Sequence, residues 1–205
     1  MSKQGEEVIR NDHVCTVGHL KFVDNFLRKI VHNPKKLFGQ YIKEGMTVID
    51  IGCGGGFVTI DFAEMVGKSG KVIAADLQEE MLKITRNRAE KACLADRIIF
   101  HQCKPDRISY KSKLDFALAF FMVHETPDIP GLLKEVYNML NDGRLFFVSD
   151  PTFYVSKTEF THTLEDAIKI GYKIHSYPKV TFGRSVILQK QKFCPIRERV
   201  APVVG

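Results

Sequence analysis

The 205-residue sequence contains no apolar stretch approaching the roughly twenty residues that a membrane-spanning helix needs. Its polar start, Met1 to Asn11, does not have the pattern of a secretory signal peptide. The five cysteines are scattered and include no Cys-x-x-Cys pair. We therefore expect a soluble cytoplasmic protein with reduced thiols, no zinc or other metal site, and no membrane partner.

Long basic runs with interleaved aromatic residues are also lacking. The sequence has 30 basic and 24 acidic residues, a formal net charge of +6, and the positive charges are dispersed along the chain. This dispersion favours an ordinary solvated surface over a nucleic-acid footprint, which stays as a minority option. Hydrophobic residues at 44% and charged residues at 26% are typical of a globular domain.

One glycine-rich segment points to a ligand. An apolar strand ends in Asp50-x-Gly52-x-Gly54-x-Gly56, and the segment Val48 to Ile60 is expected to run directly into a helix. The glycines allow a tight turn and a close approach to a ligand, and the start of the helix offers free N–H groups. We therefore expect a nucleotide-like molecule at this turn.

Two familiar fingerprints do not fit the turn. The dinucleotide pattern G-x-G-x-x-G fails at Phe57 when it starts at Gly52, and at Thr59 when it starts at Gly54. A phosphate loop needs Gly-Lys-Ser/Thr, whereas Gly56 is followed by Phe57. The remaining pattern, D-x-G-x-G-x-G, resembles the class I S-adenosylmethionine-dependent methyltransferases.

A second acidic residue strengthens that resemblance. Lys71 to Ala75 form a short apolar strand that ends at Asp76. A carboxylate at the carboxyl end of such a strand, roughly twenty residues beyond the glycine turn, can accept both ribose hydroxyls of an adenosine. An acidic residue in this place has that role in the resembled family. The alternative is that Asp76 caps the next helix, expected over Leu77 to Ala92.

Strand and helix signals alternate along the chain, which predicts an α/β fold with a doubly wound, mostly parallel sheet. The resemblance implies seven strands with an antiparallel last strand. We expect an N-terminal helical extension or lid over residues 1–44, the cofactor-binding domain over 45–190 and a tail over 191–205. Phe22 and Phe26 belong to the expected lid, and Leu37, Tyr41 and Ile42 to a second short helix.

Other elements follow from local patterns. Helices are expected from Ile129 to about Leu140, stopped by Asn141-Asp142-Gly143, and from the capping box Ser156-x-x-Glu159 to Gly171. The further strands are expected at Arg97 to His101, Leu114 to Phe121, Leu145 to Ser149, Tyr172 to Thr181, and Arg184 to Gln189. A short loop, Pro105 to Lys113, takes the place of the family's helix after the third strand.

The resemblance implies S-adenosylmethionine as the cofactor, with S-adenosylhomocysteine as its product. The residues expected to bind it are Asp50, Gly52, Cys53, Gly54, Gly56, Phe57, Asp76, Leu77, Met81, Cys103, Lys104 and Phe120. Cys53 is expected to contribute small size rather than thiol chemistry. The family often places a carboxylate after the third strand for the adenine amino group, but His101 to Lys104 contain none; Asp106, or Gln102 with backbone groups, could hold the adenine instead.

The methyl acceptor is expected beyond the fourth strand, where the sequence reads Ala119 to Asp128. The Asn/Asp-Pro-Pro-aromatic motif of nucleic-acid amino-methyltransferases is absent, and so is a Pro-Cys or Thr-Cys nucleophile at the strand-four and strand-five turns. The stretch ending in His124 resembles small-molecule methyltransferases of the ubiquinone/menaquinone and sterol types. His124 is the candidate catalytic base, or else a hydrogen-bonded anchor of its loop.

Other acidic and aromatic residues lie near His124 in the expected fold. Glu125 and Asp128 are read as a loop acid and a helix N-cap, and Asp150, Pro151, Phe153 and Tyr154 could touch the substrate. The resulting prediction is S-adenosylmethionine-dependent methyl transfer to a small-molecule acceptor. An RNA or protein methyltransferase, or a non-catalytic cofactor-binding module, stays as an alternative, and the oligomeric state is open.

Overall fold

The computed structural model describes residues 32–191 and contains one seven-stranded sheet. The strand order is β3-β2-β1-β4-β5-β7-β6. The strands from β3 to β5 pair in parallel, whereas β7 runs antiparallel to both of its neighbours, β5 and β6. This arrangement confirms the expected α/β fold with an antiparallel last strand.

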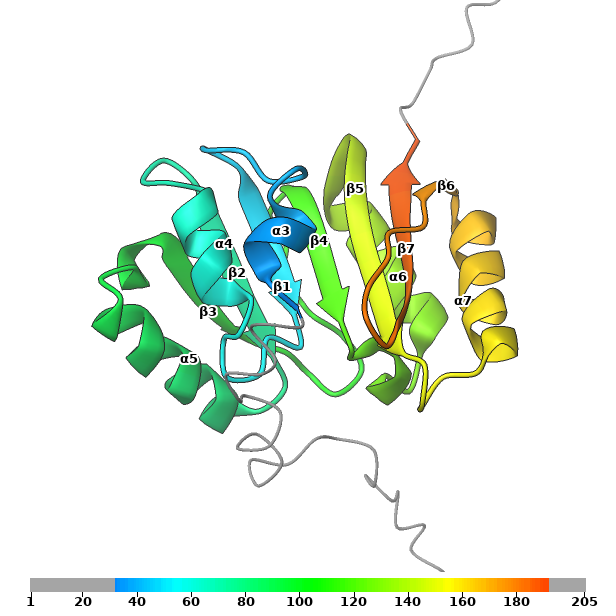
Figure 1. Cartoon of the computed structure of the whole chain (residues 1–205), viewed down its shortest axis with the longest axis horizontal. Coiled ribbons are helices and arrows are strands. Elements are labelled where there is room, and N and C mark those ends of the chain that lie inside the picture. Colours follow the sequence, from blue (N-terminus) through cyan, green and yellow to red (C-terminus); the bar gives the residue numbers. More distant parts are fainter. Residues whose placement is uncertain (1–31, 192–205) are drawn as a thin grey trace, which may run out of the picture.

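Helices cover both faces of the sheet (Figure 1). In chain order the elements are α3 (Pro34–Phe38), β1 (Thr47–Ile51), α4 (Thr59–Met65), β2 (Lys71–Asp76), α5 (Glu79–Lys91), η1 (Ala95–Arg97), β3 (Ile98–Gln102), β4 (Leu114–Phe120), η2 (Val123–Glu125), α6 (Ile129–Met139), β5 (Leu140–Pro151), α7 (Lys157–Ile170), β6 (Tyr172–Ser176) and β7 (Gly183–Lys190).

Alternation along the central strands produces two hydrophobic cores. In β1, Val48 packs in the core that contains α3, α4 and α5, whereas Ile49 packs in the core that contains α6 and α7. Side chains of successive strand residues point to opposite faces, so a strand covered on both sides is apolar throughout. Asp50, which bonds Thr59 of α4, is the charged residue in β1 and lies next to the last strand residue, Ile51, before the glycines.

Several local patterns have the expected outcome. Ser156 and Glu159 form both bonds of a capping box at the start of α7, and Gly171 ends that helix with a φ of 116°. Asp128 caps α6 and accepts a hydrogen bond from Gly131 N. Residues 105–113 form no helix, and the side chain of Glu135 in α6 accepts the N–H groups of Ile108 and Ser109 instead.

Other boundaries differ from expectation. The helix after the glycine turn starts only at Thr59, because the intervening residues form turns, and α5 starts at Glu79 instead of Leu77. Strand β5 begins at Leu140, directly after α6, and a register shift between Leu114 and Phe116 of β4 accommodates the polar residues 141–144. Strand β6 stops at Ser176 instead of the expected Thr181, so residues 177–182 form a loop before β7.

The region before β1 is described only in part. Helix α3 ends at Phe38, so Leu37 is helical as expected, whereas Tyr41 and Ile42, expected in the same helix, lie beyond it in the segment leading to β1. Tyr41 stacks on Phe116 of β4, with ring centroids 6.1 Å apart. The expected lid residues Phe22 and Phe26 lie outside the described residues. Within residues 32–191, no helix has the length and apolar character needed to cross a membrane.

Candidate cofactor and acceptor site

The turn between β1 and α4 depends on three glycines in the left-handed region. Gly52, Gly54 and Gly56 have φ values of 66°, 52° and 80°. Gly52 N and Cys53 N both donate to the carbonyl oxygen of Ala75 in β2, at 2.8 and 3.1 Å. Residues with a Cβ rarely adopt these backbone angles, so this turn requires glycine at the three positions where the sequence has it. We call residues Gly52–Gly56 the glycine turn.

The three glycines meet different surroundings. A Cβ on Gly52 would lie 2.9 Å from Met122 Cβ, and one on Gly56 would lie 2.7 Å from Thr85 Cγ2. A Cβ on Gly54 would have no atom within 4 Å. Gly52 and Gly56 are therefore needed for close packing, whereas Gly54 faces open space in which a ligand can approach the backbone.

Asp76 lies beside this open space at the carboxyl end of β2. Its Oδ2 accepts the N–H of Gly54 at 2.8 Å, and its Oδ1 accepts the N–H of Gln78 at 2.9 Å. Burial raises the pKa of the Asp76 carboxyl, while the N–H groups of Gln78 and Gly54 lower it in part. Gln78, not Asp76, is the N-cap residue of α5, so Asp76 joins the glycine turn to the start of α5 rather than capping the helix.

The rest of the glycine turn is held by side chains. Asp50 is buried and accepts a hydrogen bond from Thr59 Oγ1 at 2.6 Å, which ties the end of β1 to the start of α4. From α5, Thr85 Oγ1 donates to Gly54 O at 2.8 Å, and Arg88 Nη1 donates to Gly55 O at 2.6 Å. Thr85 and Arg88 were missed at the sequence level, although a threonine and an arginine three residues apart share one helix face.

The two cysteines near the turn are not reactive groups. Burial raises the pKa of the Cys53 thiol well above its ordinary value, with the charges of Asp50 and Asp76 adding to the effect. Burial, together with Asp76 and Glu135, raises the pKa of Cys103 to about 12. The raised pKa values keep both thiols protonated at neutral pH. Since the thiolate is the reactive form, neither side chain is expected to act as a nucleophile. This agrees with a role of Cys53 through its size.

The loop after β3 comes back to Asp76. Cys103 N donates to Asp76 O at 2.8 Å, which places Cys103 next to the ribose candidate. Asp106 is exposed and its carboxylate bonds the guanidinium of Arg107, while Gln102 Nε2 donates to Leu77 O at 3.3 Å. The adenine contact of Asp106 stays a prediction, and so does that of Gln102.

The remaining expected cofactor residues differ in burial. Phe57, Met81 and Phe120 are buried, Leu77 is partly buried, and Lys104 is exposed. Phe120 packs against Phe38 of α3 at 5.8 Å between ring centroids, and thus belongs to the core beneath the edge. Their contact with a cofactor stays a prediction.

The end of β4 is strained and touches the glycine turn. Phe121 has a φ of 62° and stacks on Phe120, with centroids 4.5 Å apart. An aromatic residue in the left-handed region is uncommon and persists where its surroundings hold it. Here Phe121 N donates to Ser149 O at 2.7 Å. The next residue, Met122, packs on Gly52, so the chain reaches His124 from directly beside the glycine turn.

His124 is paired with Asp150 at the end of β5. His124 Nδ1 lies 2.9 Å from Asp150 Oδ1, and His124 N donates to the same oxygen at 3.4 Å. Asp150 is 2% exposed. The His124 ring also stacks on Tyr154, with centroids 5.5 Å apart and an interplanar angle of 14°. The sequence nominated His124 and Asp150 separately, and the structure brings them together.

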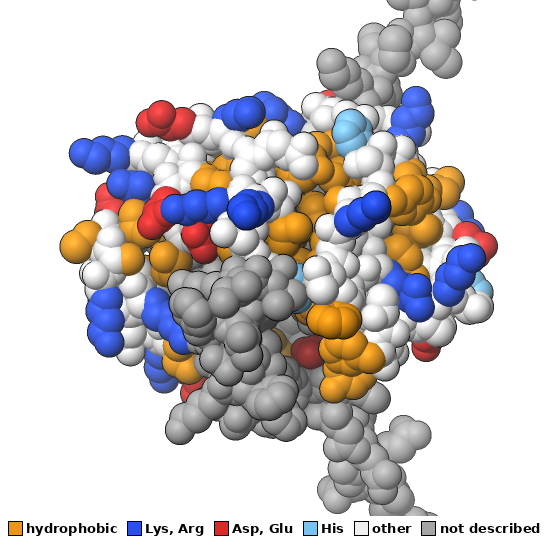
Figure 2. All heavy atoms as spheres, in the orientation of Figure 1, with side chains coloured by type: hydrophobic (Ala, Val, Ile, Leu, Met, Phe, Trp, Pro, Cys, Tyr) orange, Lys and Arg blue, Asp and Glu red, His pale blue; other side chains and the backbone are white. Residues whose placement is uncertain are grey.

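Exposed aromatic side chains lie on the loop after β5 and on the neighbouring loop before β7. Phe153, Tyr154 and Phe182 are more than 60% exposed. Phe153 and Tyr154 lie 4.9 Å apart, and Thr152 N donates to Phe182 O at 2.8 Å, which joins the loops after β5 and before β7. Figure 2 shows hydrophobic side chains along the lower edge of the molecule, where β5 ends. Exposed aromatics grouped at a sheet edge mark a binding surface more often than isolated ones do.

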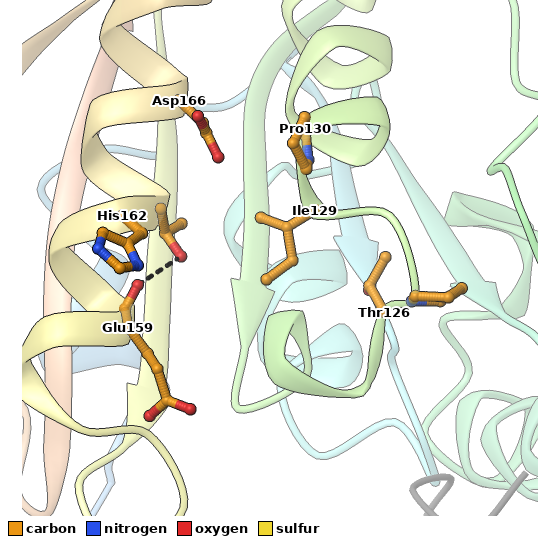
Figure 3. A pocket seen from close by; sticks show the side chains of 8 residues that line it. Thr126, Ile129, Pro130, Glu159, His162 and Asp166 are labelled. Carbon is orange, nitrogen blue, oxygen red and sulfur yellow. Dashed lines mark hydrogen bonds between the residues drawn. The ribbon is translucent and has the colours of Figure 1, made fainter.

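A separate open groove of about 320 Å³ lies between α6 and α7 (Figure 3). It is lined by Thr126, Pro127, Ile129, Pro130, Glu159, His162, Thr163 and Asp166. Its acids have structural partners, because Glu159 belongs to the capping box and Asp166 bonds Lys169 at 3.0 Å. None of the residues expected to bind the cofactor lines this groove.

The model of the family described as "Methyltransferase domain" matches residues 42–199, which include the glycine turn, Asp76 and the His124–Asp150 pair. The chain belongs to this methyltransferase family. Its seven-stranded order confirms the class I S-adenosylmethionine-dependent methyltransferase fold.

Named relatives agree with this membership. The chain is 32% identical over 120 residues to the demethylmenaquinone methyltransferase of Lactococcus lactis subsp. lactis, covering 57% of this chain and 47% of that protein. It is 26% identical over 149 residues to a ubiquinone/menaquinone biosynthesis C-methyltransferase of Hahella chejuensis, covering 72% of this chain and 56% of the relative. The aligned part is therefore about half the length of these relatives.

Solved structures support the same fold. A SAM-dependent methyltransferase from Aquifex aeolicus superposes with a TM-score of 0.77 at 26% identity, covering 86% of this chain and 99% of that one. A methyltransferase from Pyrococcus furiosus superposes with a TM-score of 0.64 at 20% identity, covering 78% and 82% of the two chains. The second likeness concerns the fold alone.

Proposed function

We propose that this chain binds S-adenosylmethionine at the glycine turn and Asp76 and transfers its methyl group to a small-molecule acceptor near His124. The observation that carries the proposal is the open space at Gly54, bordered by the buried Asp76 carboxylate. A ligand with a ribose and a charged amino-acid end fits a site that offers backbone atoms and one carboxylate at the carboxyl edge of a parallel sheet.

The residues have distinct parts in this site. Asp76 is placed to accept ribose hydroxyls, because a carboxylate has more acceptor positions than the backbone N–H groups of Gly54, Leu77 and Gln78 occupy. Thr85 and Arg88 fix the carbonyl groups of the glycine turn, which keeps the backbone in its open shape. The cofactor supplies an electrophilic methyl group carried on a positively charged sulfur.

The protein's main contribution is alignment. Since the methyl group is already activated, holding an acceptor at near-attack distance supplies much of the acceleration. Met122 connects the cofactor site with His124, since its side chain packs on Gly52 and it is the N-cap residue of η2, which carries His124. The names of the quinone-biosynthesis relatives support a small organic acceptor.

The test is methyl transfer from methyl-labelled S-adenosylmethionine in a cell extract, with the products separated into small molecules, RNA and protein. We expect label in the small-molecule fraction, and a large reduction of that label with Gly54→Asn. Label confined to RNA or protein would contradict the small-molecule acceptor. Lack of S-adenosylhomocysteine binding by calorimetry would contradict the cofactor itself.

A further inference from the structure

We infer that Asp150 is a positioning residue that holds His124 with Nε2 toward the acceptor, and that the acceptor is a ring compound whose hydroxyl group gives up its proton to His124. The inference rests on the proposed function for the methyl donor. It adds the acceptor's chemical class, the proton path and the role of a carboxylate that cofactor binding does not use.

The orientation of His124 follows from the donor and acceptor groups. An ionised carboxylate only accepts hydrogen bonds, so the contact of 2.9 Å between Nδ1 and Asp150 Oδ1 requires a proton on Nδ1. In the neutral ring the lone pair is then on Nε2. Asp150 is itself fixed, because it is buried in β5, paired in register with Arg184 of β7, and also receives the backbone N–H of His124.

The position of His124 favours a role beyond anchoring its loop. Its side chain is 20% exposed, so the ring has an open side, and Tyr154 stacks on one face. Among residues 32–191, no hydrogen bond to Nε2 is found. A histidine that is held through Nδ1 by a buried acid and has an accessible Nε2 has the arrangement of a general base.

The surroundings indicate what kind of acceptor would fit. Tyr154 stacks on the imidazole, and Phe153 lies against Tyr154 with ring centroids 4.9 Å apart. Phe182, on the neighbouring loop that bonds Thr152, adds a third exposed ring to this edge of the sheet. Flat rings stack on such faces. An acid–histidine pair can act as a base only on an acceptor that carries a proton to lose. A phenol-type or enol-type hydroxyl on a ring meets both conditions.

The reaction balances with these groups. The acceptor hydroxyl gives its proton to Nε2, and the electron pair left on the acceptor forms a bond to the methyl carbon through the oxygen or a ring carbon. The methyl–sulfur bond breaks and its electron pair stays on sulfur. When the ring carbon is the nucleophile, its hydrogen moves to the oxygen afterwards. In both cases one proton leaves through His124 to solvent for each methyl group transferred.

The first test needs no acceptor. The ring nitrogens of ¹⁵N-histidine-labelled full-length protein report the tautomer of His124 by NMR. We expect the Nδ1–H tautomer in the wild type and loss of that preference in Asp150→Asn, because an amide can also donate to Nδ1. Asp166→Asn, at a partly exposed position of α7, is the matched control and should leave the His124 signals unchanged. A wild-type ring protonated on Nε2 would overturn the inference.

The second test separates positioning from support of the fold. Catechol and 2-methylhydroquinone serve as ring-hydroxyl probes, and nicotinamide as a ring acceptor without a proton to lose. We expect methylation of a hydroxyl probe with kcat lowered roughly 100-fold by His124→Asn and by Asp150→Asn, with S-adenosylhomocysteine affinity within about twofold of wild type. An Asp150→Asn variant that loses cofactor affinity as much as kcat would mark a structural role and overturn the inference.

The two proposals fail in different ways. Wild-type protein that binds S-adenosylhomocysteine but methylates only nicotinamide, or neither hydroxyl probe, would overturn this inference and leave the cofactor site standing. Wild-type protein that does not bind S-adenosylhomocysteine would overturn the proposed function and this inference with it.

Discussion

Around the glycine turn, the backbone is held by Asp76, Thr85 and Arg88, each through a hydrogen bond to a main-chain group. Around His124, the important contacts join side chains, namely its pairing with Asp150 and its stacking on Tyr154. We call the first region, at the ends of β1 and β2, the cofactor half, and the second, at the ends of β4 and β5, the acceptor half. A site built on backbone shape suits one constant ligand, whereas a site built on side chains can change its ligand by substitution.

The sequence predicts the cofactor half better than the acceptor half. The glycine turn could be recognised because positive φ angles demand glycines at fixed spacing. Asp76 could be recognised because it ends a short apolar strand, which is a local pattern. The pairing of His124 with Asp150 spans 26 residues and depends on the register of β4 and β5, which no local pattern reveals. The late start of α4 and the early start of β5 were missed because turns and bulges follow tertiary contacts more than local propensity.

The largest expected effect is on the open space of the cofactor half. Asparagine tolerates the left-handed backbone, so Gly54→Asn should fold while its side chain fills the space that a ligand would use. We expect S-adenosylhomocysteine affinity to fall by roughly 100-fold, measured by calorimetry. Gly45→Asn is the matched control, because Gly45 has a φ of 83° and a Cβ there would meet only Ser69 Oγ at 3.5 Å. Equal losses in both variants would indicate strain and not occupancy.

The next effect concerns the carboxylate of the cofactor half. Asp76→Asn removes the charge and one acceptor, so we expect affinity for S-adenosylhomocysteine to fall roughly 10- to 100-fold. Asp128→Asn should leave the affinity unchanged, because asparagine is an equally good N-cap for α6. Unchanged affinity in Asp76→Asn would remove Asp76 from the cofactor site.

The same substitution gives a pH-dependent signal. Burial raises the pKa of Asp76 in the folded protein, so folding favours the protonated carboxyl. Its contribution to stability is fully present below the ordinary pKa of 3.8 and is lost as the pH rises through the raised folded value. Urea unfolding at several pH values should therefore show that wild type loses stability relative to Asp76→Asn as the pH rises above 3.8. The opposite slope would contradict the buried environment of Asp76.

A smaller effect is expected behind the glycine turn. Thr85→Val keeps the shape of the side chain but removes its hydrogen bond to Gly54 O. We expect a loss of about 1 kcal/mol in unfolding free energy and a fall in cofactor affinity of roughly fivefold. Thr163→Val in α7 is the control, since Thr163 is also buried and bonds a helix carbonyl, that of Glu159. Cofactor affinity that changes equally in the two variants would show that Thr85 has no special part in the site.

The smallest effect on cofactor affinity should come from the acceptor half. Tyr154→Ala removes an exposed ring that stacks on His124, so affinity for S-adenosylhomocysteine should change by less than about twofold. For a ring-hydroxyl acceptor, KM should rise several-fold because one stacking face is lost. A large loss of cofactor affinity here would mean that the two halves are not separate.

Binding of S-adenosylhomocysteine, followed through the backbone amide NMR signals of the wild-type protein, shows directly whether the glycine turn and Asp76 form the cofactor site. We expect the largest changes at Gly52–Gly56 and at Asp76 and Leu77, with small changes in α7. Changes concentrated on Ile129, His162 and Asp166, which line the groove between α6 and α7, would contradict this assignment.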